Sequence, residues 1–470
     1  MRNLKHIYYL ILVTVFLFTY GQVQGQSTAL DWSYATFGEK AAWGEVVDVT
    51  IDETTGDVYE YGYTSSAGKP TTDGSVMNPG DGSFFSEYDF YVSKFDSDGN
   101  LIYRKYIGGS KYELSVIGAA QNGYFYMAGQ TISTDYPVTD GSTFGGGASN
   151  ADIAFTVIDP SGNIFFSTYI GGTEGDFLRG LEVLNDRIVI MGSVNSTTLP
   201  TTNSTTFGGG SDIYTIVYDL SMNVLASSYI GGNSTDNNPI MLRNNGKYFF
   251  IARTNSTDFP VTDGSSINSG VGSDYVFATL DDNLNIIDAR FLGTVNSEQS
   301  IHREMLEVDD DYLYFAPPVR HSGLVTTNGT DVHTTNVYDI YFAKFNHDLS
   351  LSYATYFDYE HQQNGSNIRV ENGEAYISMY TNGEAGMPNT SGIPANTSTV
   401  NSSSIYHDFY VMKIDQSNTI AYATFLGGSS TEQANYIGVE KGEMFLVGNT
   451  RSNRWFCISR FPRYYSVSIR

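Results

Sequence analysis

The sequence from Asp89 to Gly109 reads Asp-Phe-Tyr-Val-Ser-Lys-Phe-Asp, then Ser-Asp-Gly-Asn, then Leu-Ile-Tyr-Arg-Lys-Tyr-Ile-Gly-Gly. The two outer runs alternate with the period of a pleated strand. The residues between them, Asp, Gly and Asn, tolerate the backbone angles of a tight turn. The stretch is therefore predicted to form a β-hairpin.

The same hairpin pattern returns along the whole chain. Its copies begin at Asp89, Asp152, Asp212, Asp274, Asp339 and Asp408. Successive starting positions are 63, 60, 62, 65 and 69 residues apart. Most copies end in Gly-Gly or a single Gly, whereas the fifth ends Tyr356-Phe357-Asp358. A period of this size, built from strand-like segments, indicates stacked or radial units.

A second hairpin lies between consecutive copies of the first. One example runs from Glu113 through the turn Asn122-Gly123 to Gly129. Each period therefore holds four strands, which is the content of one propeller blade. Polar loops that contain residues such as Pro137 and Pro200 join the periods, and their Pro and Gly residues keep them out of the sheets.

The two ends of the chain are predicted to complete the last blade together. Trp32–Phe37 matches the second strand of the recurring hairpin, and Trp455–Phe461 matches its first strand. Their pairing would close a ring and remove exposed sheet edges. Alternatively, Tyr464–Ile469 is the fourth strand of that blade and Trp32–Phe37 is an additional outer strand. Residues 26–470 are thus predicted to form a single all-β domain, a seven-bladed β-propeller of four-stranded antiparallel blades closed by both termini.

Residues 1–25 have the features of a secretory signal peptide. Arg2 and Lys5 precede an apolar run from Ile7 to Tyr20, and small residues precede Gln26. The apolar run is short for a membrane span, and an uncleaved anchor is the alternative. No later stretch is apolar enough to cross a bilayer, so we expect a secreted or cell-surface protein with no membrane span after signal removal.

The charge of the chain limits its partners. There are 25 Lys and Arg residues against 51 Asp and Glu residues, a formal net charge of -26. This balance argues against nucleic acid and anionic membrane surfaces as partners, because both require basic residues. The single cysteine, Cys457, has no internal disulfide partner and is interpreted as a buried structural thiol. Stability is therefore expected to come from packing and ring closure.

The recurring motifs resemble a known family. Asp-x-Phe/Tyr-Val-x-Lys-hydrophobic-Asp, Gly-Asn, Tyr-hydrophobic-Gly-Gly and Thr-x-Ser-x-Asp-Tyr/Phe-Pro-Val-Thr are similar to the bacterial SBBP-type β-propeller repeat. That repeat occurs in exported and cell-surface proteins, often of Bacteroidetes-like bacteria. The resemblance covers nearly the whole mature chain and is weaker in the copy that begins at Asp339. It implies a seven-bladed propeller outside the cytoplasm. It implies no defined activity, so no functional residue is carried over.

Two groups of acidic residues could hold cations. The aspartates that open the six hairpins could bind one cation per blade, but we predict that they accept hydrogen bonds from backbone N–H groups of the preceding loops. Asp96, Asp98 and Asn100 have the alternating oxygen ligands of a calcium loop. The full twelve-residue calcium pattern is missing, so a hairpin turn is predicted. No cofactor is expected, and calcium is the alternative.

Catalysis would need polar residues that converge near a cleft, such as the paired carboxylates of a glycosidase or lyase. The weak candidates Glu182, Glu307 and Arg369 share one column on the strands expected to be innermost. The same column is assigned to Gly118, Leu242 and Gly438 in other blades. There is no metal-binding histidine motif, nucleophile elbow or phosphate loop.

The sequence therefore favours a non-catalytic scaffold that binds an extracellular protein or glycan through loops on one face. Two alternatives remain. One is an extracellular carbohydrate-active enzyme, and the other is a structural module of an envelope assembly. The oligomeric state is not predicted.

Overall fold

The computed structural model describes most of the residues between Gly44 and Thr450. The described ranges are 44–65, 71–76, 88–147, 150–265, 272–294, 296–320, 323–329, 338–357, 363–381, 386–390, 407–426, 432–440 and 442–450. The expected signal peptide, the strands expected at Trp32–Phe37, Trp455–Phe461 and Tyr464–Ile469, and Cys457 lie outside these ranges. The chain divides into two compact units, Met1–Gly231 and Gly232–Arg470, and each is described by itself.

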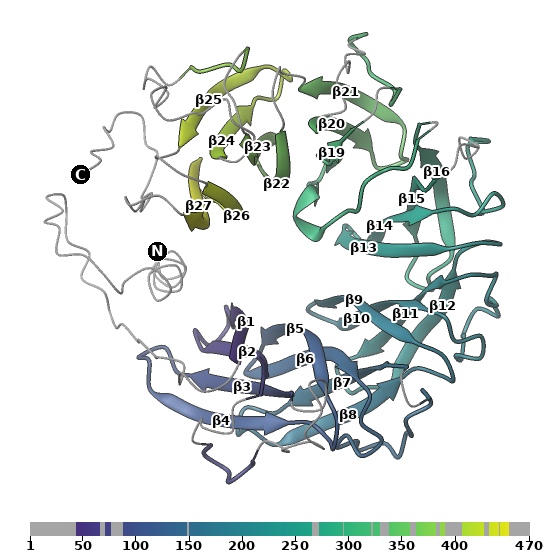
Figure 1. Cartoon of the computed structure of the whole chain (residues 1–470), viewed down its shortest axis with the longest axis vertical. Helices are drawn as coiled ribbons and strands as arrows, with labels where there is room; N and C mark the ends of the chain where they lie inside the picture. Colours follow the sequence, from purple (N-terminus) through teal and green to yellow (C-terminus); the bar gives the residue numbers. More distant parts are fainter. Residues whose placement is uncertain are drawn as a thin grey trace, which may run out of the picture. The chain divides into compact units, whose positions relative to one another are not determined.

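The first unit contains three four-stranded antiparallel sheets (Figure 1). Their strand orders are β1-β2-β3-β4, β5-β6-β7-β8 and β9-β10-β11-β12. The strands are β1 (Gly44–Ile51), β2 (Val58–Thr64), β3 (Asp89–Phe95), β4 (Leu101–Ile107), β5 (Glu113–Gln121), β6 (Tyr124–Thr131), β7 (Asp152–Ile158), β8 (Ile164–Ile170), β9 (Asp176–Val183), β10 (Arg187–Val194), β11 (Asp212–Asp219) and β12 (Val224–Ile230).

The second unit repeats this plan with one irregular sheet. Its strands are β13 (Asp236–Asn244), β14 (Lys247–Thr254), β15 (Asp274–Leu280), β16 (Ile286–Leu292), β17 (Leu306–Val308), β18 (Tyr312–Phe315), β19 (Pro318–Val319), β20 (Asp339–Asn346), β21 (Leu351–Phe357), β22 (Gln363–Glu371), β23 (Glu374–Thr381), β24 (Asp408–Ile414), β25 (Ile420–Leu426), β26 (Glu432–Glu440) and β27 (Glu443–Thr450). In the irregular sheet β18 and β19 both pair with β20 and together replace one continuous strand. A 3-10 helix, η1 (Arg303–Met305), precedes it.

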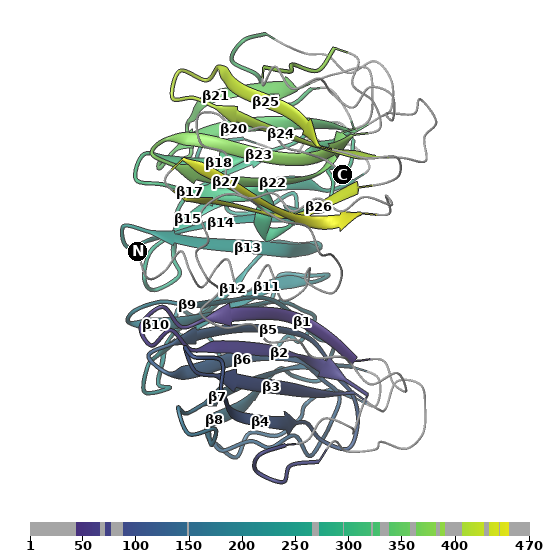
Figure 2. The same ribbon diagram turned by 90° about the vertical axis from the view of Figure 1, so that its left-hand side faces the viewer.

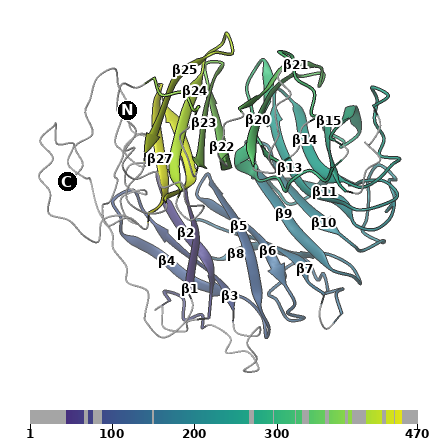
Figure 3. The same ribbon diagram turned by 45° about the horizontal axis from the view of Figure 1, so that its top comes forward.

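Each four-stranded sheet begins with the second type of hairpin and ends with the hairpin that Asp opens. The predicted all-β architecture of repeated four-stranded antiparallel sheets is thus confirmed for the described residues. Within the first unit the leading strands β1, β5 and β9 are neighbours (Figure 2). Within the second unit β13, β17, β22 and β26 follow one another in the same way (Figure 3). Only β26 and β27 of the last sheet are described, so the blade count and the closure stay predictions.

Apolar side chains fill the space between consecutive sheets. Between the first two sheets the rings of Tyr59 and Phe125 stack with their centroids 5.1 Å apart. All seven residues of β3 and of β7 are buried. Since both faces of these strands are covered, apolar residues also stand next to one another, as in Phe90-Tyr91-Val92 of β3 and Val157-Ile158 of β7, and the alternation is incomplete. The core is therefore a set of layers, each shared by two sheets.

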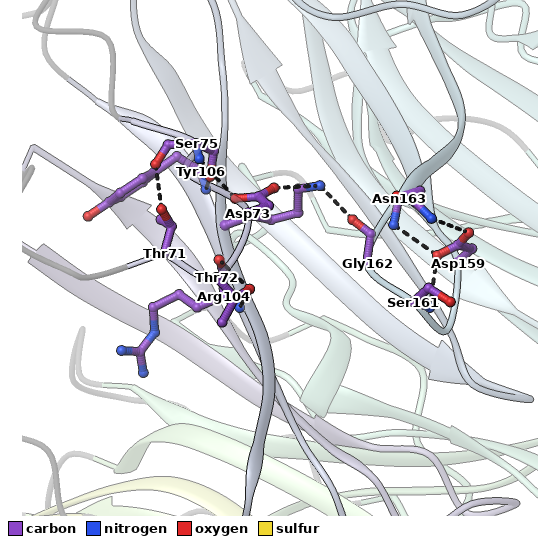
Figure 4. A network of polar contacts seen from close by, with 11 residues as sticks. Thr71, Thr72, Asp73, Ser75, Arg104, Tyr106, Asp159, Ser161, Gly162 and Asn163 are labelled. Carbon is purple, nitrogen blue, oxygen red and sulfur yellow. Dashed lines mark hydrogen bonds and ion pairs between the residues drawn. The ribbon is translucent and has the colours of Figure 1, made fainter.

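The polar loop before each Asp hairpin covers the outer edge of its own sheet (Figure 4). The Thr72 N–H donates to the Arg104 carbonyl at 3.0 Å, and the Arg104 N–H donates back to Thr72 Oγ1 at 3.0 Å. The same threonine contact with the last strand recurs in the next five sheets, at Thr139, Thr202, Thr262, Thr327 and Thr390. These loops satisfy backbone groups of an edge strand that would otherwise invite association.

The same edge is tied to the neighbouring sheet of the first unit. Lys105 Nζ lies 3.1 Å from Asp73 Oδ2 and donates a hydrogen bond to the Gly162 carbonyl at 2.5 Å. Gly162 belongs to the turn between β7 and β8, which Asp159 closes by accepting N–H groups of Ser161 and Asn163 (Figure 4). The loop, the edge strand and the next turn are therefore connected.

Removing the hydroxyl of Thr139 should destabilise the second sheet. Its Oγ1 accepts the Ser167 N–H at 2.8 Å, and Thr139→Val leaves that donor without a partner while it keeps the side-chain shape. We expect a loss of about 1–2 kcal/mol in the free energy of unfolding, measured in urea. The control Thr139→Ser keeps the acceptor and should change stability by less than about 0.5 kcal/mol. Equal losses in both variants would contradict the edge role.

Candidate functional site

The recurring aspartates open the third strand of each sheet and are buried. Asp89, Asp152, Asp212, Asp274, Asp339 and Asp408 are between 0% and 5% exposed. Two of them show how the carboxylate is used. Asp152 Oδ2 accepts the Gly145 N–H at 2.8 Å, and Asp212 Oδ2 accepts the Gly208 N–H at 2.6 Å. Each donor lies in the loop that leads into the strand, so these two carboxylates shape the loop before them.

A second row of buried carboxylates lies beside the first, and the sequence reasoning missed it. Glu113, Asp176 and Asp236 open the leading strands β5, β9 and β13, and Glu298 has the same place before β17. All four are at most 4% exposed. Each stands four residues after the second position of a Gly-Gly or Gly-Thr pair. That constant spacing is the signal that could have revealed them.

The second row ties the glycine turn before each leading strand to the loop after the strand that pairs with it. Asp176 Oδ2 accepts the Gly172 N–H at 2.8 Å and the Ser196 hydroxyl at 2.7 Å. Asp236 does the same with Gly232 and Ser256, at 2.8 and 2.7 Å. The recurring Gly-Gly and Thr-x-Ser motifs are therefore parts of one hydrogen-bonded junction.

The glycines of this junction leave space for the two rows. A Cβ on Gly171 would lie 2.4 Å from Asp152 Cγ, and a Cβ on Gly172 would lie 2.7 Å from Ser196 Cβ. A Cβ on Gly108 would lie 2.3 Å from Asp89 Oδ1 and 2.6 Å from Glu113 Oε2. Only glycine lets the chain pass at these distances. Asp89 and Glu113 therefore also approach each other closely around Gly108.

Burial and the neighbouring carboxylates favour the protonated acids. Burial, with the charge of Asp176 as a smaller cause, raises the pKa of Asp152 to about 6. Burial, with the charge of Asp274 as a smaller cause, raises the pKa of Glu298 to about 7. Burial and Asp89 also raise the pKa of Glu113. A pKa near neutrality suits proton transfer, but these groups are closed off from solvent and have no access to a substrate. Their role is in the architecture.

The proposed calcium loop is a closed hairpin turn. Asp96 Oδ1 accepts the N–H groups of Asp98 and Asn100 at 3.0 and 2.8 Å, and Oδ2 accepts the Asn100 side chain at 2.9 Å. These hydrogen bonds, led by that from the Asn100 side chain, lower the pKa of Asp96. Matching turns centre on Asp159, Asp219, Asp281 and Asp415. Nowhere in the described ranges do three or more His, Cys, Asp or Glu side chains gather to hold a metal ion.

The three catalytic candidates occupy equivalent positions. Glu182 faces Val189, Glu307 faces Tyr314 and Arg369 faces Tyr376 across their strand pairs. In the second unit Arg369 Nη1 lies 3.7 Å from Glu307 Oε2, so Glu307 is engaged in an ion pair between two sheets. Glu182 belongs to the first unit.

One residue of this column was assigned wrongly. Gly118 faces Met127, whereas Ala119 faces Tyr126 and occupies the position that corresponds to Glu182. The two-residue turn Asn122-Gly123 fixes the pairing, because it sets Gln121 opposite Tyr124. A shift of one residue exchanges the faces of a strand, so Gly118 does not belong to the column.

No protein-family model matches the chain, and no curated protein matches it. Some solved structures are distantly similar. A subtype N11 neuraminidase-like protein of A/flat-faced bat/Peru/033/2010 is 7% identical, with 74% of this chain and 87% of that chain covered and a TM-score of 0.36. A subtype N10 neuraminidase-like protein of A/little yellow-shouldered bat/Guatemala/060/2010 is 9% identical, with 71% and 88% covered and a TM-score of 0.33.

Pyrococcus horikoshii acylaminoacyl peptidase is 11% identical, with 87% of this chain and 49% of that chain covered and a TM-score of 0.40. The residues that the structure describes contain no helix long and apolar enough to cross a membrane.

Adding a methyl group at Gly171 should break the junction between the second and third sheets. Gly171→Ala places a carbon 2.4 Å from Asp152 Cγ, and the forced displacement should cost about 1–3 kcal/mol in urea unfolding. Gly147→Ala is the matched control, because the nearest atom to its Cβ lies 3.9 Å away. We expect the control to change stability by less than about 1 kcal/mol. Similar losses at both positions would contradict the steric explanation.

The buried acids should make stability fall as pH rises. Asp152 has a pKa of about 6 in the folded protein against 3.8 ordinarily, so the folded state binds more protons between these values. Its contribution is present at low pH and is lost as pH rises through about 6. Asp152→Asn should remove about 1–3 kcal/mol of the stability loss between pH 5 and pH 8.

Asp96→Asn is the control for this pH dependence. The pKa of Asp96 is lowered, so its contribution is constant over that range. The slope of unfolding free energy against pH should therefore match the wild type in Asp96→Asn and be shallower in Asp152→Asn. Identical slopes in all three proteins would refute the raised pKa of Asp152.

Proposed function

We propose that this chain is an exported β-propeller of the SBBP type whose four-stranded sheets are seven blades. In this proposal residues 1–25 are a cleaved signal peptide, and the terminal strands close the ring in the last blade. The repeated sheets and the shared apolar layers support the proposal. So does the hydrogen bond that recurs between consecutive sheets within each unit, at Asp176 in the first and at Glu298 in the second.

The propeller acts as a non-catalytic scaffold that binds an extracellular protein or glycan through loops on one face. One observation carries this function. The polar residues that recur from sheet to sheet form hydrogen bonds within the architecture, as Asp176 and Thr139 do. The loops at the strand ends differ in sequence from sheet to sheet, and a rigid framework can present such loops to a partner.

A binding screen of the mature chain, residues 26–470, tests the scaffold function. On a glycan array and in a pull-down from culture medium, we expect a specific glycan or protein to bind. We expect no turnover of a polysaccharide panel, because Glu307 is paired with Arg369 and the buried acids have no access to substrate. Turnover that Glu182→Gln or Glu307→Gln abolishes would overturn the scaffold function in favour of a carbohydrate-active enzyme.

Export is tested separately by intact mass and N-terminal sequencing of the protein secreted from a bacterial host. A mature chain that begins close to Gln26 is expected. Full-length protein retained inside the cell would contradict the proposed signal peptide.

A further inference from the structure

Two arginines in the second unit have no carboxylate partner. Five other arginines pair with acids: Arg104, Arg187, Arg243, Arg290 and Arg369. Among the described residues Arg253 and Arg320 form no such pair, and neither does Arg179 of the first unit, which contacts the Ser193 hydroxyl and the Phe177 ring. Arg320 has only its stack on the Tyr338 ring, and Arg253 has two long hydrogen bonds to serine hydroxyls. The chain as a whole has a net charge of -26. An arginine side chain that forms no ion pair in such an acidic protein can bind an anion from outside.

The fold places these two arginines in one connected group. Arg253 lies on β14, and its guanidinium donates to Ser300 Oγ at 3.5 Å and to Ser297 Oγ at 3.4 Å. In the same segment Gln299 Oε1 accepts the Tyr338 hydroxyl at 3.2 Å. The Arg320 guanidinium lies 4.7 Å from the centre of the Tyr338 ring. These contacts, together with the backbone from Ser297 to Ser300, therefore link one arginine to the other.

The framework under this group is fixed by backbone pairing. Val319 pairs with Asp339, so the residues next to them, Arg320 and Tyr338, are neighbours across the strand pair. The Glu298 N–H donates to the Ser273 carbonyl at 2.7 Å and anchors the segment that carries the serines and Gln299. Arg253 faces Tyr275 across β14 and β15. The group therefore lies on strand ends and an anchored segment, and its members are half-buried or exposed.

The guanidinium N–H donors of this group have few hydrogen-bond acceptors within the protein. Arg253 Nε is buried and has no hydrogen-bond partner, as is also true of the Nε atoms of Arg243 and Arg290, so the donors that a ligand could reach are the Arg253 Nη groups. Their hydrogen bonds to the serine hydroxyls are long, at 3.5 and 3.4 Å. Stacking on Tyr338 orients the Arg320 guanidinium and leaves its edge N–H donors for another group. Glu298 acts on Arg253 through space, but its Oε1 accepts the Thr294 N–H at 2.8 Å. A planar anion would supply the missing acceptors.

We propose that Arg253 and Arg320, with the hydroxyls and amide between them, bind a carboxylate-bearing sugar of an acidic glycan. The guanidinium group matches a carboxylate with two parallel hydrogen bonds. The serine hydroxyls and the Gln299 amide suit sugar hydroxyls, which both donate and accept. The Tyr338 ring adds apolar contact area beside a polar tip. The inference rests on the proposed scaffold function and specifies the chemistry of its ligand.

Calorimetric titration of the mature chain with tetragalacturonic acid tests this site. We expect saturable binding that weakens as salt rises. Arg320→Gln and Arg253→Gln should each weaken it at least tenfold. Arg243→Gln removes the same charge, but Arg243 pairs with Asp282 at 3.2 Å, so this control should change the affinity by less than twofold. Because Arg320 is exposed, its variant should fold even if Arg253→Gln does not, and circular dichroism checks both.

Each other outcome overturns the site or its ligand class. Absence of tetragalacturonate binding at millimolar concentration, or equal losses in Arg320→Gln and Arg243→Gln, would overturn the site. Hexaglutamate bound as tightly as the uronate, with the same dependence on Arg320, would overturn the glycan class, and so would equally tight binding of a neutral galactose tetrasaccharide. If the array or the pull-down finds a partner whose binding both glutamine variants leave unchanged, this inference fails while the scaffold function stands.

Discussion

The contact between a buried carboxylate and a glycine turn joins the second sheet of the first unit to the third. Asp176 holds the Gly172 N–H and the Ser196 hydroxyl, while Gly171 gives Asp152 the space beside it. The contact joins the last strand of one sheet, the first strand of the next and the loop that follows it. A residue with a side chain at either glycine, or a shorter side chain at the acid, would remove part of this contact. The repeated motif is therefore selected by the junction and not by any single strand.

This junction also explains why the most regular polar residues of the chain are poor candidates for chemistry. Burying a carboxylate costs free energy unless hydrogen bonds compensate. Asp176 receives four such bonds from Gly172, Asn195 and Ser196. Its neighbour Asp152 receives fewer, and burial raises its pKa. Burial raises the pKa of Asp176 as well as that of Asp152, and protonation of either acid lowers the repulsion between the two carboxyl groups.

Much of the fold could be predicted from the sequence because its signals are local. The Asp89 hairpin is defined by its own turn, and it forms as β3 and β4. The rest depends on contacts between distant residues. Glu113 does not stand out until it is seen that Gly109 lies four residues before it and Thr131 lies across the strand pair. The threonine that covers each sheet edge looked like an ordinary loop residue for the same reason. The wrong placement of Gly118 has a local origin, because counting back from the Asn122-Gly123 turn places Ala119 in the column.

The positions of the acidic residues in the fold change how the net charge of the chain is interpreted. Many carboxylates are occupied in turns, as at Asp96 and Asp219, or in the buried rows, so the formal charge overstates how many acids serve solubility or attract cations. Most arginines with described contacts are paired with acids within the sheets. Arg253 and Arg320 differ from these paired arginines, because their direct contacts are with serine hydroxyls and an aromatic ring. Arg179 of the first unit has similar contacts, with the Ser193 hydroxyl and the Phe177 ring. Specificity requires that the wrong ligand leave such donors unpaired. An uncharged partner would leave both guanidinium groups without an anionic acceptor, whereas a carboxylate would supply one.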